Sequence, residues 1–86
     1  MNRIRLLIVD DHEVVRLGLK TLLEDEPDME VVAEADSAEQ ALVRMGQFDP
    51  DVVVMDIQLP GRSGIEACKE LCRTYPDAKI VVLTSH

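Results

Sequence analysis

Three aspartates carry the clearest chemical signal in this sequence of 86 residues. Asp10 and Asp11 follow the apolar run 4–9, and Asp56 ends a second apolar run, 51–56. Carboxylates that converge on one site repel one another unless a cation shares them, and Mg²⁺ prefers oxygen ligands of this kind. The pattern therefore predicts a Mg²⁺ site beside an acceptor aspartate, provided that the fold brings the two runs together.

The two apolar runs are predicted to be strands. Both are short and rich in β-branched residues, which is typical of strands buried on both faces of a parallel sheet. Side chains just past the carboxyl ends of such strands lie in the crevice where open α/β sheets bind ligands. Two further strands are predicted, one over 80–83 and one over 30–35, which is more polar and is therefore expected at an edge.

Apolar residues spaced three and four apart predict three helices between these strands. The first ends near Pro27, the second begins at Ser37 with a capping-box sequence, and the third ends at Pro76. Their predicted buried stripes are Val14, Val15, Gly18, Leu19, Leu22 and Leu23; Ala38, Ala41, Leu42 and Met45; and Ile65, Cys68, Leu71 and Cys72. The order βαβαβαβ with right-handed crossovers predicts one α/β domain, its parallel sheet covered by helices on both faces.

The two cysteines, Cys68 and Cys72, stand four residues apart and would share one face of the third helix. They are interpreted as small buried hydrophobic residues facing the sheet. A disulfide between them is not expected in a reducing compartment. They could form half of a metal site, but the sequence offers no second Cys/His pair to complete it.

Charge and length exclude several classes of partner. The formal net charge is −8, from 17 acidic and 9 basic residues. Such a surface repels nucleic acid phosphates and anionic membranes, so direct binding to either is not expected. The first apolar run is too short for a signal peptide or a membrane span, and a cytoplasmic location is the default expectation.

Five segments together resemble a known family. They are LIVDDH at 7–12, VRLGL at 15–19, PDVVVMD at 50–56, LPGRSGIE at 59–66 and VVLTSH at 81–86. In one register they resemble a response-regulator receiver domain of the NarL/FixJ type, which has a flavodoxin-like fold. The resemblance implies the strand order 2-1-3-4, and it implies a signalling domain, not an enzyme, that takes a phosphoryl group from a partner histidine kinase.

The resemblance also implies a role for each matching residue. Asp56 resembles the phospho-acceptor. Asp11 and Asp56 resemble direct Mg²⁺ ligands, together with the backbone carbonyl of Gln58, while Asp10 acts largely through a water. Thr84 resembles the switch hydroxyl that hydrogen-bonds the phosphoryl group, and Gln58 and His86 occupy positions that tune how long the phosphate persists.

The sequence departs from the family pattern after the fourth strand. The family's fold continues through a helix, a strand that ends in an active-site lysine, and another helix, and a DNA-binding domain usually follows. Residues 1–86 are therefore expected to be a partial receiver domain that lacks these elements and carries no DNA-binding domain. Lys79 precedes the fourth strand, at the wrong end of the sheet to replace the missing lysine, so weak Mg²⁺ binding and poor phosphorylation are expected.

The open edge at 80–83 leads to a further expectation. A flat apolar edge strand with unpaired N–H and C=O groups recruits another chain. A two-fold symmetric homodimer through this edge and the uncovered sheet faces is predicted.

Two alternatives to the receiver hypothesis are open. One is a self-associating structural fragment with no surviving activity. The other is a phosphohydrolase of the haloacid dehalogenase type, but that chemistry requires Asp-x-Asp after the first strand, whereas Asp10 and Asp11 are adjacent. The histidines His12 and His86 could be metal ligands, and they are interpreted as solvated loop residues.

Overall fold

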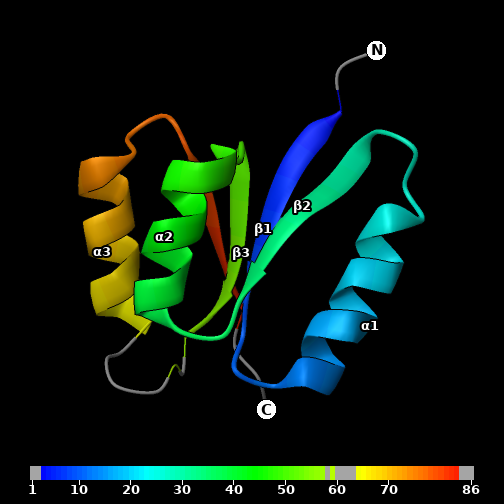
Figure 1. The fold of residues 1–86 in the computed structure, drawn as a ribbon, viewed down its shortest axis with the longest axis horizontal. Helices are drawn as coiled ribbons and strands as arrows, with labels where there is room; N and C mark the ends of the chain where they lie inside the picture. The colour runs from blue at the N-terminus through cyan, green and yellow to red at the C-terminus, as the bar shows by residue number, and fades with distance from the viewer. Residues whose placement is uncertain (1–2, 58, 60–63, 84–86) are drawn as a thin grey trace.

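The computed structural model describes residues 3–57, 59 and 64–83, and in it strands and helices alternate along the chain (Figure 1). The elements are β1 (Ile4–Val9), α1 (Glu13–Glu24), β2 (Met29–Ala35), α2 (Ala38–Phe48), β3 (Val52–Asp56), α3 (Gly64–Thr74) and β4 (Lys79–Leu83). The predicted order βαβαβαβ is confirmed, and each strand begins within one residue of its predicted start.

The four strands form one parallel sheet in the order β2-β1-β3-β4. This is the flavodoxin-like order that the family resemblance implies. The polar strand β2 lies at one edge, as predicted, and β4 lies at the other edge of the described sheet. The two aspartate-bearing strands, β1 and β3, are neighbours at its centre.

The helices lie on both faces of the sheet, with α1 on one face and α2 and α3 on the other (Figure 1). The main core lies between the sheet and the α2–α3 layer. Its fully buried members include Leu7, Val9, Val53 and Met55 from the strands and Ala41, Met45 and Leu71 from the helices. Neighbouring strand residues point to opposite faces, and Leu6, Ile8 and Val54 are buried as well. Burial on both faces explains why the strands are continuous apolar runs.

The predicted buried stripe of α1 is wrong, because none of its twelve residues is buried. Val14 is 82% exposed and Leu22 is 71% exposed. Among the described elements, the helix packs mainly on β1 and β2. It lies beside a hollow of about 340 Å³ and does not close over the sheet. The hollow is lined by Ile4, Leu6, Leu19, Leu23, Met29, Val52, Val54, Val81 and Leu83.

The start of α2 agrees with the predicted capping box. The Gln40 backbone N–H donates to Ser37 Oγ over 3.2 Å, satisfying a helix N–H that has no partner within the helix. The Gln40 side chain reaches back and accepts from the Asp36 N–H at 2.7 Å, one residue before the usual partner. Three of the four predicted stripe residues, Ala38, Ala41 and Met45, are buried.

The predicted buried face of α3 is confirmed at Leu71 and in part at Cys68, which packs against the core, and it is wrong at Ile65 and Cys72. The buried residues of this helix are Gly64, Ala67 and Leu71, whereas Cys68 is half-buried and Cys72 is exposed. The orientation of α3 about its own axis follows from close contact at Gly64, where an added Cβ would lie 2.5 Å from the Ile57 Cα. Both cysteines are free, and burial, followed by the neighbouring Cys72, raises the pKa of the Cys68 thiol.

The three helices have 12, 11 and 11 residues. Within the described part of the chain, none is long and apolar enough to cross a membrane.

Candidate functional site

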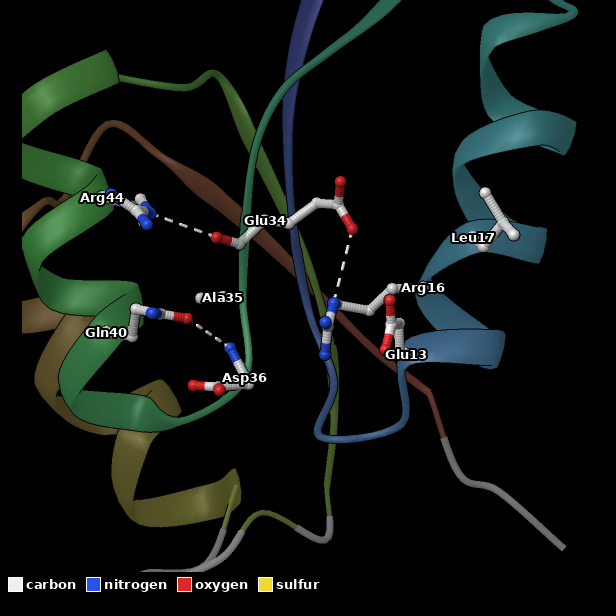
Figure 2. A pocket seen from close by; sticks show the side chains of 8 residues that line it. All are labelled: Glu13, Arg16, Leu17, Glu34, Ala35, Asp36, Gln40 and Arg44. Atoms are coloured by element: carbon white, nitrogen blue, oxygen red, sulfur yellow. Dashed lines mark hydrogen bonds and ion pairs between the residues drawn. The ribbon is translucent and has the colours of Figure 1, made fainter.

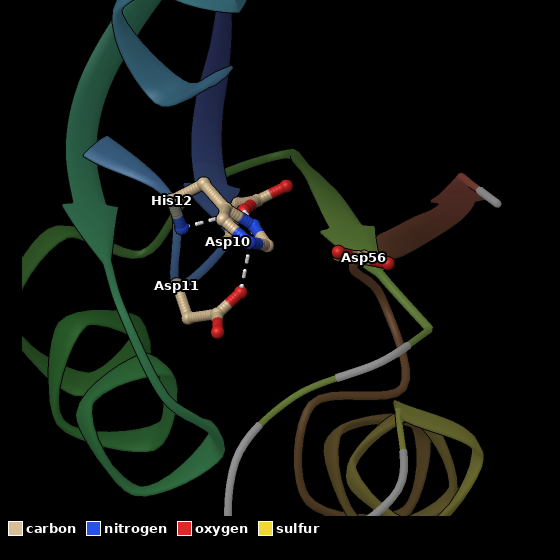
Figure 3. A group of neighbouring side chains, drawn as sticks. All are labelled: Asp10, Asp11, His12 and Asp56. Carbon is tan, nitrogen blue, oxygen red and sulfur yellow. Dashed lines mark hydrogen bonds and ion pairs between the residues drawn. The ribbon is translucent and has the colours of Figure 1, made fainter. Parts of the chain in front are cut away.

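The predicted aspartates meet at the carboxyl edge of the central strands. Val9 of β1 pairs with Met55 of β3, so the next residue of each chain segment, Asp10 and Asp56, stands at the same edge. One ligand atom from each of Asp10, Asp11, His12 and Asp56 lies within 4.8 Å of the others (Figure 3). We call these four residues the acidic cluster.

Burial is uneven within the acidic cluster. Asp10 is 4% exposed and Asp56 is 3% exposed, whereas Asp11 and His12 face solvent. Two buried carboxylates close together are costly unless a positive charge or hydrogen bonds compensate them. The three carboxylates supply the hard oxygen donors that Mg²⁺ takes, so the donor set fits this ion.

Asp10 is held firmly in place by its backbone and its side chain. Its N–H donates to the Ala35 carbonyl of β2 over 3.0 Å, which continues the sheet by one residue. Its Oδ1 accepts from the backbone N–H of His12 at 2.8 Å. This local turn, in which a carboxylate accepts from the backbone two residues on, aims the carboxylate back over the end of β1.

His12 is exposed, as its interpretation as a solvated loop residue predicts, but it also contacts two carboxylates of the acidic cluster. Its side chain is 63% exposed, yet Nδ1 lies 3.1 Å from Asp10 Oδ1 and 3.0 Å from Asp11 Oδ1. The imidazole therefore bridges two carboxylates. Its position directly after Asp10 and Asp11 was the available sequence signal.

Three predicted site residues, Gln58, Thr84 and His86, lie outside the described residues. Their roles therefore stay as predictions from the resemblance. The placement of Lys79 agrees with expectation, because it pairs with Val52 at the start of β3, while Asp56 ends that strand and pairs with Leu83.

A residue without an assigned role also contacts the acidic cluster. Arg16 of α1 donates from Nη1 to the backbone carbonyl of Asp10 over 2.6 Å. The sequence signal was its place in the VRLGL segment, but nothing local indicates which carbonyl a helical arginine will contact.

Comparison with known proteins identifies the family. A family model described as "Response regulator receiver domain" matches residues 6–86. The chain belongs to this family. The predicted flavodoxin-like receiver fold and the family resemblance are thereby confirmed.

Curated relatives are transcription regulators of the response-regulator type. The chain is 48% identical over 82 residues to the transcriptional regulatory protein LiaR of Bacillus subtilis, covering 95% of this chain and 39% of that protein. It is 45% identical to the DNA-binding transcriptional activator DevR/DosR of Mycobacterium tuberculosis, covering 96% of this chain and 38% of the relative. The chain thus spans about two fifths of the length of the relatives it matches.

Solved structures share the fold over the whole chain. A LuxR-family two-component response regulator from Aurantimonas sp. superimposes with a TM-score of 0.92 at 41% identity, covering 99% of this chain and 61% of that one. The isolated receiver domain of RcsB from Salmonella enterica serovar Typhimurium, with phosphomimetic BeF₃⁻, also gives 0.92, at 30% identity over 99% of this chain and 64% of that one.

Proposed function

We propose that this chain is the phospho-accepting part of a two-component response regulator, with Asp56 as the acceptor and a histidine kinase as the donor. The observation that carries the proposal is the convergence of Asp10, Asp11 and Asp56 at the carboxyl edge of β1 and β3, in a chain that belongs to the receiver family. Convergence on neighbouring central strands is what a shared metal and phosphoryl site requires.

In the proposed reaction, an Asp56 carboxylate oxygen attacks the phosphorus of a phosphohistidine. The bond between phosphorus and the imidazole nitrogen breaks, and an aspartyl phosphate forms. A bound Mg²⁺ would neutralise phosphoryl oxygens so that two anions can approach each other. Asp11, Asp56 and the Gln58 carbonyl would hold the ion directly, and Asp10 would hold it through a water.

Other parts of the proposal concern residues whose placement is not described. Thr84 would hydrogen-bond the phosphoryl group after transfer, and Gln58 and His86 would tune its lifetime. We expect weak Mg²⁺ binding and poor labelling of Asp56 in this chain. The reason is that Lys79 of β4 pairs with Val52, at the start of β3, whereas Asp56 ends β3. Lys79 therefore cannot place an ammonium beside Asp56.

For the protein that contains this chain, we propose control of transcription by phosphorylation in the cytoplasm. The support is that LiaR is named a transcriptional regulatory protein and DevR/DosR a DNA-binding transcriptional activator. A net charge of −8 argues that these 86 residues themselves do not bind DNA.

The alternative is a self-associating structural fragment without activity, which the exposed side chains of β4 favour.

Titration with Mg²⁺ followed by beryllofluoride, read by amide NMR shifts, separates the phospho-accepting function from the structural alternative. We expect Mg²⁺ to shift the amides of Asp10, Asp11 and Asp56, and beryllofluoride to add further shifts only when Mg²⁺ is present. In the Asp56→Asn variant the second set should disappear.

The matched control is Asp51→Asn, at the opposite end of β3. Its carboxylate Oδ2 accepts from the Arg5 N–H at 2.9 Å, away from the acidic cluster. This variant should respond as the wild type does. If the wild-type chain shows no shift at these amides in millimolar Mg²⁺, the structural alternative is favoured.

A further inference from the structure

Arg16 connects the acidic cluster to the edge strand β2. From one guanidinium, Nη1 donates to the Asp10 carbonyl over 2.6 Å and Nε donates to Glu34 Oε1 over 3.3 Å. Figure 2 shows Arg16 extending from α1 toward the Glu34 carboxylate. Both residues line a polar hollow of about 430 Å³ at the β2 edge of the sheet. The Arg16 side chain is only 18% exposed. A planar guanidinium held at two nitrogens has little freedom to turn.

The carbonyl that Arg16 contacts belongs to the peptide bond between Asp10 and Asp11. Because that peptide unit is planar, fixing its oxygen fixes the plane that joins the two Cα atoms. The directions in which both carboxylates leave the backbone are then set together. The Asp10 N–H, held at 3.0 Å by the Ala35 carbonyl, fixes the preceding peptide plane in the same way.

Glu34 holds the Arg16 guanidinium in place. Its carboxylate lies on β2, next to the strand that carries Asp10, and it also lies 3.9 Å from the Lys20 Nζ. The guanidinium is therefore aimed at the Asp10 carbonyl by a neighbouring strand and not by α1 alone.

We propose that Arg16, held by Glu34, is a positioning residue that sets the orientation of the Asp10–Asp11 peptide and so aims both carboxylates toward Asp56. The inference rests on the proposed function, because its consequence is the affinity of the acidic cluster for Mg²⁺. Arg16 does not touch the metal or the phosphoryl group in this scheme.

Electrostatics and positioning predict opposite results when Arg16 is changed. Removing a positive charge near the acidic cluster makes it more negative, which by itself tightens cation binding. Loss of a group that orients metal ligands typically costs at least tenfold in affinity. The direction of the change in the Mg²⁺ dissociation constant therefore separates the two explanations.

Arg44 of α2 is a matched control. Its Nε donates to the backbone carbonyl of Glu34 over 3.2 Å and its Nη1 to Gln47 Oε1 over 2.9 Å. It is an arginine that contacts the same strand residue from the other helix, and neither of these two hydrogen bonds reaches the acidic cluster. Arg44→Met removes the same charge and similar hydrogen bonds without releasing the Asp10–Asp11 peptide.

The test is Mg²⁺ binding by calorimetry and amide NMR on the 86-residue chain, with the urea unfolding midpoint measured alongside. Arg16→Met keeps the aliphatic stem and should weaken Mg²⁺ binding about tenfold. Arg16→Lys keeps the charge but cannot make both hydrogen bonds in the same geometry. It should weaken Mg²⁺ binding by about threefold, which places its affinity between those of the wild type and Arg16→Met. Arg44→Met should bind Mg²⁺ with an affinity within about twofold of the wild type. This should hold even if its unfolding midpoint falls as much as that of Arg16→Met.

Binding by Arg16→Met as tight as that of the wild type, or tighter, overturns the inference while leaving the proposed function intact. Should Arg16→Met not fold, wild-type affinity in Arg16→Lys overturns it instead. If the wild-type chain itself does not bind Mg²⁺, the proposed function is contradicted, and the inference about Arg16 falls with it.

Discussion

At the scale of single residues, the main feature is a pair of buried carboxylates. Asp10 and Asp56 are 4% and 3% exposed and belong to the same four-residue cluster. Two negative charges brought that close in a partly dry site repel each other, and the fold must supply the free energy to hold them there. Binding of a cation should relieve this repulsion and so stabilise the folded chain.

This repulsion leads to a prediction for Asp56→Asn, which keeps the side chain's shape and removes one charge. Without Mg²⁺, its free energy of unfolding should exceed that of the wild type by about 1 kcal/mol. Added Mg²⁺ should narrow the difference, because binding to the folded wild type stabilises it. Urea denaturation in EDTA and in Mg²⁺ measures both quantities.

Asp51→Asn is the comparison for charge alone. It also removes a carboxylate from the β3 region, but this carboxylate accepts a hydrogen bond from the Arg5 N–H. It should not stabilise the chain. A loss of stability in Asp56→Asn under metal-free conditions would contradict the repulsion argument.

At the scale of elements, close packing at one glycine determines which face of α3 is buried. The Gly64 N–H donates to the Ile57 carbonyl over 2.6 Å, tying the start of α3 to the residue that follows β3. With Gly64 facing the sheet, residues three and seven positions later, Ala67 and Leu71, are buried and Cys72 turns outward. The helix that follows β3 is thereby held in one orientation about its axis.

Gly64→Ala should therefore destabilise the chain. The added Cβ would lie 2.5 Å from both the Cα and the carbonyl oxygen of Ile57, and these are backbone atoms that cannot rotate away. We expect a loss of about 2 kcal/mol in the free energy of unfolding, typical of overpacking in a closely packed site. Urea denaturation followed by circular dichroism provides the measurement.

The paired control is Gly18→Ala in α1. Nothing lies within 4 Å of a Cβ built at Gly18, and alanine favours a helix interior over glycine by about 1 kcal/mol. This variant should gain stability. Equal effects in the two variants would show that backbone propensity, not contact with Ile57, decides the result at Gly64.

At the scale of the whole molecule, the sheet is covered unevenly. The α2–α3 face holds the main core, while the α1 face leaves an apolar hollow of about 340 Å³ that reaches β4. Every residue of β4 is exposed or half-buried, including Val81, Val82 and Leu83 at 47%, 40% and 39%. Such an edge presents both unpaired backbone groups and apolar side chains to another chain.

We expect the 86-residue chain to form a homodimer through β4 and the open sheet face. Sedimentation equilibrium should show a dimer at tens of micromolar, and Val81→Lys should shift it to monomer by placing a charge in the hollow. Ile65→Lys changes an apolar residue of α3 that is 54% exposed, and it should leave the dimer intact. A monomer at every concentration of the wild type would contradict the prediction.

The sequence by itself determined the order of elements, the parallel sheet and the meeting of Asp10, Asp11 and Asp56. These features follow from local patterns, since apolar runs and helical spacing define each element and parallel strands bring their carboxyl ends to one edge. Only the tertiary structure decided how deeply α1 packs, which face of α3 is buried, and that Arg16 contacts the acidic cluster. Those depend on contacts between residues far apart in the chain, where one close approach, as at Gly64, rotates a whole helix.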